Sequence, residues 1–187
     1  MSIIPTNKDG FNSFSEFPGM SYNIISYLMD NNELLWRLLV YNDNFAFRLD
    51  TDHPNLTKAQ KGLLVYDGLR EQTSCRVFLD LKQDDSLTQE MTMLRISPIE
   101  IIPTDNVLGK VAIGFEIFSH VKINTLGNYQ TRVDMIVQQL LQSLNGQLIG
   151  GIGNLFFNSK TSSRCKVTTL GSIPYHGKGL VMVVGSV

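Results

Sequence analysis

The segment from Lys110 to Gly153 constrains the fold of this 187-residue chain more than any other. Its first part alternates in hydropathy, with one parity formed by Val111, Ile113, Phe115, Ile117, Ser119, Val121 and Ile123. That period of two predicts a strand with one buried face. After a polar turn at 124–130, apolar residues recur at helical spacing: Val133, Ile136, Val137, Leu140, Leu141 and Leu144. The segment therefore predicts a strand, an amphipathic helix over about 131–145 and a glycine-rich exit into another strand.

The rest of the chain predicts more helices before this segment and more strands around it. Two short helices are expected within 21–41, the first capped by Ser21 and the second by Asn31 or Asn32. Thr57 is placed to cap a third helix, with Leu63 and Leu64 facing inward. Strands are expected at about 75–81, 91–102, 154–158, 163–169 and 179–187.

The polar loop at 82–90 is compatible with a hairpin between the first two of these strands. Pro98 indicates an edge position, a bulge or a break in the second strand. The order of helices, strands, helix and strands predicts an α+β fold. We expect a mixed, mainly antiparallel sheet flanked by helices, with the long helix packed on the sheet.

Residues 1–20 predict an extended N-terminal arm, followed by a single α+β domain over residues 21–187. Pro and Gly at positions 5, 10, 18 and 19 disfavour a helix there. Phe11, Phe14 and Phe17 are spaced three residues apart and need an apolar surface. That surface is either the chain's own domain or a neighbouring subunit.

Charge and cysteine content exclude several classes of protein. Only 18% of residues are charged, below the roughly 25% usual for soluble domains, which is typical of a chain held in protein contacts or of a monomer with an uncharged polar surface. The net charge of −1 provides no global attraction to nucleic acid or acidic membranes. Cys75 and Cys165 are too far apart for a zinc knuckle, and we expect free, buried thiols. With no signal-peptide pattern and no apolar run of roughly 18 residues, the protein is expected in a reducing, aqueous compartment, away from membranes.

Candidate chemistry is sparse. His53, His120 and His176 lack the spacing of a helical zinc motif. Glycines 150, 151 and 153 follow a helix instead of opening one, which argues against a dinucleotide loop and favours a tight reversal of the chain. The acidic residues Asp80, Asp84, Asp85 and Glu90 lack EF-hand spacing and indicate a solvated loop. No catalytic residue, cofactor or metal site is predicted.

The C-terminal part of the chain supplies the remaining candidate residues. Residues 176–179 are predicted to form a turn before the terminal strand. In residues 180–184, both alternating sets of positions are apolar. Such a strand is covered on two faces, either centrally in the sheet or by another chain. The predicted subunit-interface residues are Phe11, Phe14, Phe17, His120, Leu180, Val181 and Met182. Three basic residues are predicted to form a modest patch lining a channel: Arg164, Lys166 and Lys178.

Four motifs carry a resemblance to structural proteins of tailed-bacteriophage necks and tails. They are Glu116-Ile-Phe-Ser-His120 on the strand, Arg132-Val-Asp-Met-Ile136 opening the helix, Leu144-Asn-Gly146 closing it and Gly151-Ile-Gly-Asn-Leu155 after it. The segments 34–41 and 56–61 are similar in style to the same group. The closest functional type is a tail terminator or related head-to-tail completion protein, and the resemblance covers roughly residues 24–160.

The resemblance implies a non-enzymatic virion protein that is assembled in the host cytoplasm. Such proteins form homo-oligomeric rings, commonly hexameric, which cap the tail tube and join it to the neck. Expected partners are further copies of the chain and other neck or tail proteins, with DNA passing through transiently without specific binding. One alternative is another connector, tube or baseplate component. An alternative of a different class is a small enzyme with a non-contiguous site using His120, Asp134 and His176.

Overall fold

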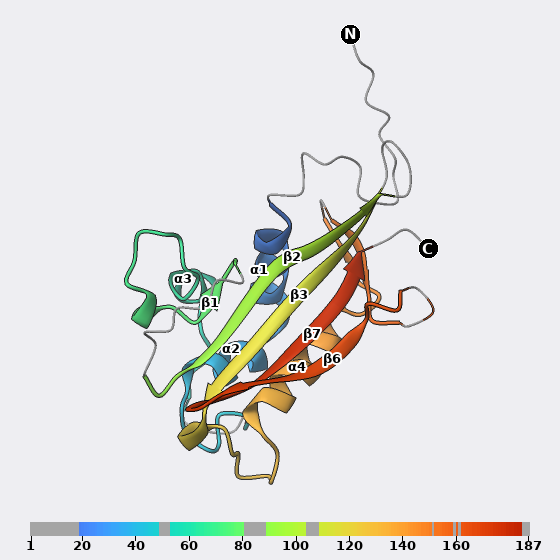
Figure 1. The fold of residues 1–187 in the computed structure, drawn as a ribbon. Helices are drawn as coiled ribbons and strands as arrows, with labels where there is room; N and C mark the ends of the chain where they lie inside the picture. The colour runs from blue at the N-terminus through green and yellow to red at the C-terminus, as the bar shows by residue number, and fades with distance from the viewer. Residues whose placement is uncertain are drawn as a thin grey trace.

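The computed structural model describes residues 19–48, 53–80, 89–103, 109–150, 152–158, 160 and 162–184. Phe11, Phe14 and Phe17, and with them almost all of the expected arm, lie outside the described residues. The described chain folds into a seven-stranded sheet with helices on one face (Figure 1). The predicted α+β class, with a mixed and mainly antiparallel sheet, is confirmed.

The sheet is built around two long antiparallel ladders. Strand β2 (Thr92–Pro103) pairs with β3 (Gly109–His120), and β3 pairs with β7 (Tyr175–Val184). The other side of β7 pairs with β6 (Lys166–Ser172) and, beyond it, with β5 (Gly153–Phe156), which in turn pairs with β4 (Leu148–Ile149). The terminal strand is therefore central, which was one of the two alternatives open from its sequence.

The helices form where the sequence provides capping residues and apolar stripes. Their bounds are α1 (Met20–Asn31), α2 (Glu33–Val40), α3 (Lys58–Leu63) and α4 (Arg132–Leu144). Asn32 caps α2, Thr57 caps α3 in a capping box, and Thr131 caps α4, as expected. Ser21 does not cap α1, because the helix begins at Met20 and Gly19 occupies the N-cap position.

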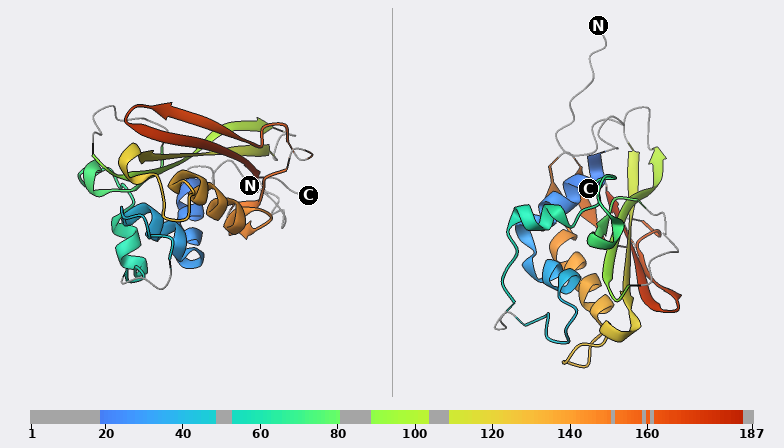
Figure 2. Two further views of the ribbon diagram at one scale, coloured as in Figure 1. Left: turned by 90° about the horizontal axis from the view of Figure 1, so that it is seen from below. Right: turned by 90° about the vertical axis from the view of Figure 1, so that its left-hand side faces the viewer.

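In the described part of the chain, helices cover only one face of the sheet. Figure 2 shows the helices gathered beneath the sheet and its other face turned away from them. The alternate residues of β3 from Val111 to Ile117, together with Leu180 and Met182 of β7, pack with α1, α2 and α4 into the main core. On the outer face a smaller cluster gathers at one end of the sheet: Cys75, Phe78, Met91, Met93, Phe118 and Tyr175. The apolar residues of β3, which alternate along the strand as predicted, thus face the core.

Three sequence expectations are corrected, and the role of Pro98 is resolved. The first strand, β1 (Val77–Phe78), is only two residues long and runs parallel to β2, so the two do not form a hairpin. Residues 176–179 belong to β7, and the turn lies earlier, at Ile173 and Pro174 between β6 and β7. Leu63 is exposed instead of facing inward, because α3 ends there. The register of β2 shifts between Pro98 and Glu100, so the proline marks a bulge, one of its predicted roles.

Candidate functional site

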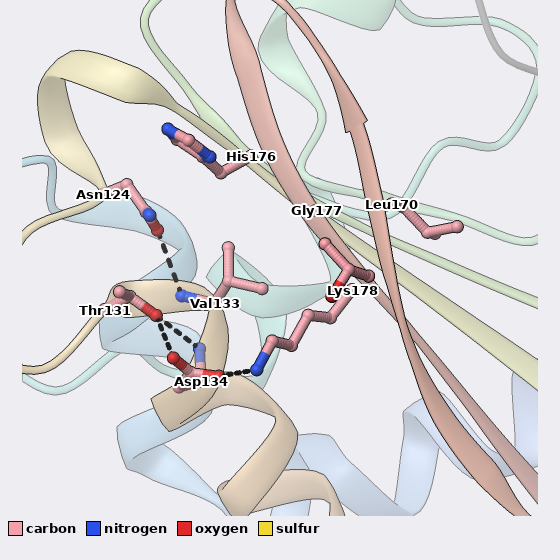
Figure 3. Close-up of a pocket in the computed structure, with 9 residues that line it drawn as sticks. Asn124, Thr131, Val133, Asp134, Leu170, His176, Gly177 and Lys178 are labelled. Carbon is pink, nitrogen blue, oxygen red and sulfur yellow. Dashed lines mark hydrogen bonds and ion pairs between the residues drawn. The ribbon is translucent and has the colours of Figure 1, made fainter.

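A small hollow lies where α4 begins against the hairpin of β6 and β7. Its volume is about 130 Å³, and it is lined by Asn124, Thr131, Val133, Asp134, Thr169, Leu170, His176, Gly177 and Lys178. Figure 3 shows Lys178 reaching from β7 to the Asp134 carboxylate at the start of the helix. This is the place where the structure brings together side chains that the sequence left far apart.

The polar groups at this helix end are used by the fold itself. The Asp134 amide donates to Thr131 Oγ1 at 3.1 Å, and the Val133 amide donates to Asn124 Oδ1 at 3.3 Å. The amides of Arg132 and Met135 donate to backbone carbonyls at 2.7 and 3.1 Å. Because these four amides already have acceptors, the helix end is not a prepared cradle for an anion.

Asp134 is likewise held by its neighbours. Thr131 Oγ1 donates to its Oδ2 at 2.6 Å, and Lys178 Nζ pairs with its Oδ1. Partial burial raises the pKa of Asp134, but the hydrogen bonds from Lys178 and Thr131 outweigh burial and lower the pKa below its usual value. A carboxylate held ionised between two donors is suited to clamping β7 onto α4, and poorly suited to accepting a proton near neutral pH.

The enzyme alternative required three side chains in one cleft. Asp134 and His176 do share the hollow, whereas His120 does not line it. His120 is 7% exposed, packs edge-to-face on Tyr175 with ring centroids 5.5 Å apart, and accepts a hydrogen bond from the Lys122 amide at 3.3 Å. The structure therefore brings together two of the three residues and separates the third.

The three predicted basic residues are also separated. Arg164 and Lys166 lie just before and at the start of β6, both exposed, with Arg164 paired to Glu100 at 2.8 Å. Lys178 points to the helix side of the sheet, where it contacts Asp134. A channel lining formed by this chain would therefore use Arg164 and Lys166 without Lys178.

The predicted interface residues occupy different environments. Leu180 and Met182 are fully buried in the chain's own core beneath the helices. Val181 lies between them on the outer face and is half-buried. The most exposed of the described large hydrophobic side chains are instead in loops, where Leu69, Tyr129 and Ile173 are 92%, 100% and 100% exposed. Tyr129 adopts a left-handed backbone with φ of 65°, which is rare for a residue other than glycine.

Arg132 is a structural residue that sequence reasoning missed. It is fully buried and donates from Nε to the Ile123 carbonyl at 3.0 Å. Its other nitrogens donate to the carbonyls of Leu38, Tyr41 and Asp43 at 2.8, 2.6 and 2.8 Å. Burial lowers its pKa to about 10, so the guanidinium stays charged at neutral pH. The one available signal was a basic residue in the first turn of α4, where the helix dipole disfavours it.

The outer face of the sheet carries a second polar feature. Arg95 and Glu116 are cross-strand partners there, and the Arg95 guanidinium lies 5.4 Å from the centre of the Phe78 ring. Burial raises the pKa of Glu116, and Arg95 offsets this only in part. Glu116 therefore remains a partly desolvated carboxylate near the middle of a face that no helix covers.

Within the described residues, no three His, Cys, Asp or Glu side chains come together as ligands for a metal ion. Of the acidic run, Asp84 and Asp85 lie outside these residues, and Glu90 pairs with Lys122. Both cysteines are free thiols, Cys75 buried as expected and Cys165 only half-buried. Every helix in the described part of the chain is too short or too polar to span a bilayer.

The comparison with protein families identifies the family to which the chain belongs. The family described as YomW matches residues 32–169, which is most of the chain. The chain belongs to the YomW family. This is a phage-associated family, which confirms the phage part of the resemblance and does not specify a tail terminator. No curated protein matches the chain.

Proposed function

We propose that this YomW-family protein is a non-enzymatic structural protein of a tailed-phage virion, assembled in the host cytoplasm. Its role would be to form a ring, with six copies as the expected number, that ends the tail tube and joins it to the neck. Membership of a phage-associated family carries the phage assignment, and the motif resemblance at 116–155 adds the terminator role. Another connector, tube or baseplate component is the nearest alternative.

The described surface supports a role in protein contacts. Tyr129 and Ile173 are large side chains that are both 100% exposed at loop tips, where a partner protein would find apolar surface to cover. The hollow at α4 is poorly suited to catalysis, because Asp134 is already paired with Lys178 and hydrogen-bonded to Thr131. DNA would pass the ring without specific binding, with Arg164 and Lys166 as the exposed cations of the β6 side.

The proposal is tested by locating the protein in purified particles. Electron microscopy of virions carrying a tagged copy should place it at the head–tail junction, and native mass spectrometry of the free protein should show a closed homo-oligomer. A label on the tube or baseplate would favour the alternative assembly role. A strictly monomeric protein that is absent from particles would overturn both assignments.

A second measurement asks whether the exposed loop tips are contacts. Tyr129→Ser and Ile173→Ser should lower the yield of joined, infectious particles in complementation, because each removes a large apolar side chain from the surface. Tyr22→Ser is the matched control, since Tyr22 is exposed on α1, away from those loops. Equal yields from all three variants would count against contacts at the tips.

A further inference from the structure

The free edge of β2 and the free edge of β6 are built differently. Beyond its short contact with β1, strand β2 contains Pro98, the register shift and a terminal Pro103, three devices that hinder pairing with another strand. Strand β6 has seven residues without proline or a register shift and pairs, among the described residues, with β7 alone. The edge of β6 is therefore open to a further strand.

The register shows which backbone groups face that open edge. Ser172 and Tyr175 flank a two-residue turn, and in such a hairpin the closing pair exchanges both hydrogen bonds. Pairs alternate from there, so the amides and carbonyls of Val167, Thr169 and Gly171 point away from β7. These three residues are exposed. They present a row of donors and acceptors at the spacing that an added strand requires.

The chain itself contains a segment of suitable length and charge. Residues 1–18 precede the described structure and reach about 60 Å when extended at about 3.3 Å per residue. A domain of this size has a radius of gyration of about 15 Å, so the segment is long enough to cross to a neighbouring copy. The stretch from Phe11 to Phe17 carries one charged residue, Glu16, and Lys166 is exposed at the start of β6, so the two are complementary in charge.

We propose that residues 1–18 of one copy add as an extended strand to β6 of a neighbouring copy. The proposal deepens the ring assignment and rests on the self-assembly it assumes. The backbone groups of Val167, Thr169 and Gly171 supply the hydrogen bonds. Val167, 40% exposed, and the half-buried Leu170 offer apolar surface on either face of the edge to the phenylalanines. Each copy would then contact one neighbour through its residues 1–18 and the other neighbour through its β6 edge. Such a heterologous contact is the kind that closes rings.

The first experiment distinguishes a neighbour from the chain's own arm. In a Cys165→Ser background, full-length Ser13→Cys and Thr169→Cys proteins are mixed and mildly oxidised; Cys75 is fully buried and stays. A disulfide-linked pair should form at least tenfold more than with Gln138→Cys, an exposed position on α4, as the partner. Equal yields would overturn the proposal. The proposal would also be overturned if a variant with both Ser13→Cys and Thr169→Cys formed an intramolecular disulfide at low protein concentration while the mixture of single variants formed none.

The second experiment tests strand addition by site-resolved hydrogen exchange on the full chain. In the assembled protein the outward amides of Val167 and Thr169 should be protected, and substituting all three phenylalanines by serine should speed their exchange at least tenfold. The amides of Thr168 and Leu170, which face β7, should not change and serve as the internal control. An assembled ring in which the substitutions leave all four amides unchanged would overturn the arm contact while the ring assignment stands. A monomeric wild-type chain would instead overturn the ring assignment.

Discussion

Replacing Arg132 by methionine should be strongly destabilising, because one buried guanidinium satisfies four carbonyls from three segments. The carbonyls of Leu38 and Ile123 are buried, so each loses its partner without gaining water, at a cost of about 1–3 kcal/mol apiece. Those of Tyr41 and Asp43 are partly buried and can be rehydrated. Methionine retains much of the apolar packing, so the expected loss in the free energy of unfolding is about 3–5 kcal/mol.

The assay is unfolding by urea and, separately, by heat, each followed by circular dichroism. For a chain of this size, a loss of that amount should lower the melting temperature by roughly 6–20 °C, with the denaturant slope unchanged. Arg164→Met is the matched control: Arg164 is exposed and has one ion pair, so its loss should cost less than about 1 kcal/mol. Arg132→Lys keeps the charge but not the fork of donors and should fall between the two. If Arg132→Met is no less stable than Arg164→Met, the inference from the four hydrogen bonds is refuted.

Three further predictions concern the α4 hollow and the sheet. Thr131→Ala should cost about 1 kcal/mol of unfolding free energy by removing the cap of α4, whereas Thr131→Ser should cost a few tenths; denaturant midpoints decide, and equal midpoints would contradict the cap. The folded pKa of Asp134 lies below the usual 3.8, so the stability that its carboxylate contributes is present above that pH and is lost as pH falls through the folded value. The free energy of unfolding should therefore decline less steeply on acidification in Asp134→Asn than in the wild type. Parallel pH curves for the two proteins would contradict this. Gly177→Ala should cost about 1–3 kcal/mol, since its Cβ would lie 2.7 Å from the Phe118 ring, while Gly171→Ala, which meets nothing within 4 Å, should be close to neutral in thermal melts.

The sequence predicted the parts of the fold whose stability is local and periodic. The stripe from Val133 to Leu144 and the cap at Thr131 mark α4 in the sequence, because both signals lie within the helix itself. The alternation from Val111 to Ile117 likewise determines β3 and its core face. A strand was predicted over about 75–81, but the length and the partner of β1 could not be predicted, because two residues carry no period. Its parallel pairing with β2 depends on contacts across the chain.

The hollow at α4 was predicted only in part, for a related reason. The sequence separates Asp134 from His176 and Lys178 by about forty positions, and the three meet only because β7 passes the start of α4. Residues 176–179 were expected to be a turn because glycine is the strongest local turn signal. In the sheet, Gly177 and Gly179 instead leave room for the side chains of Phe118 and Thr168 on neighbouring strands. Local sequence cannot distinguish the two uses of glycine.

The glycines also determine how the outer face can be used. A Cβ at Gly114 would lie 2.7 Å from Ile99, one at Gly177 would lie 2.7 Å from Phe118, and one at Gly179 would lie 2.9 Å from Thr168. Side chains from adjacent strands therefore lie flat over the glycines, and much of this face is buried without a second layer of structure. This face also carries the ionisable cross-strand partners Arg95 and Glu116, which makes it less suited to packing against another sheet. In the proposed ring, contacts between copies would therefore be made at the open edge of β6 and at the exposed loop tips, not across the broad face.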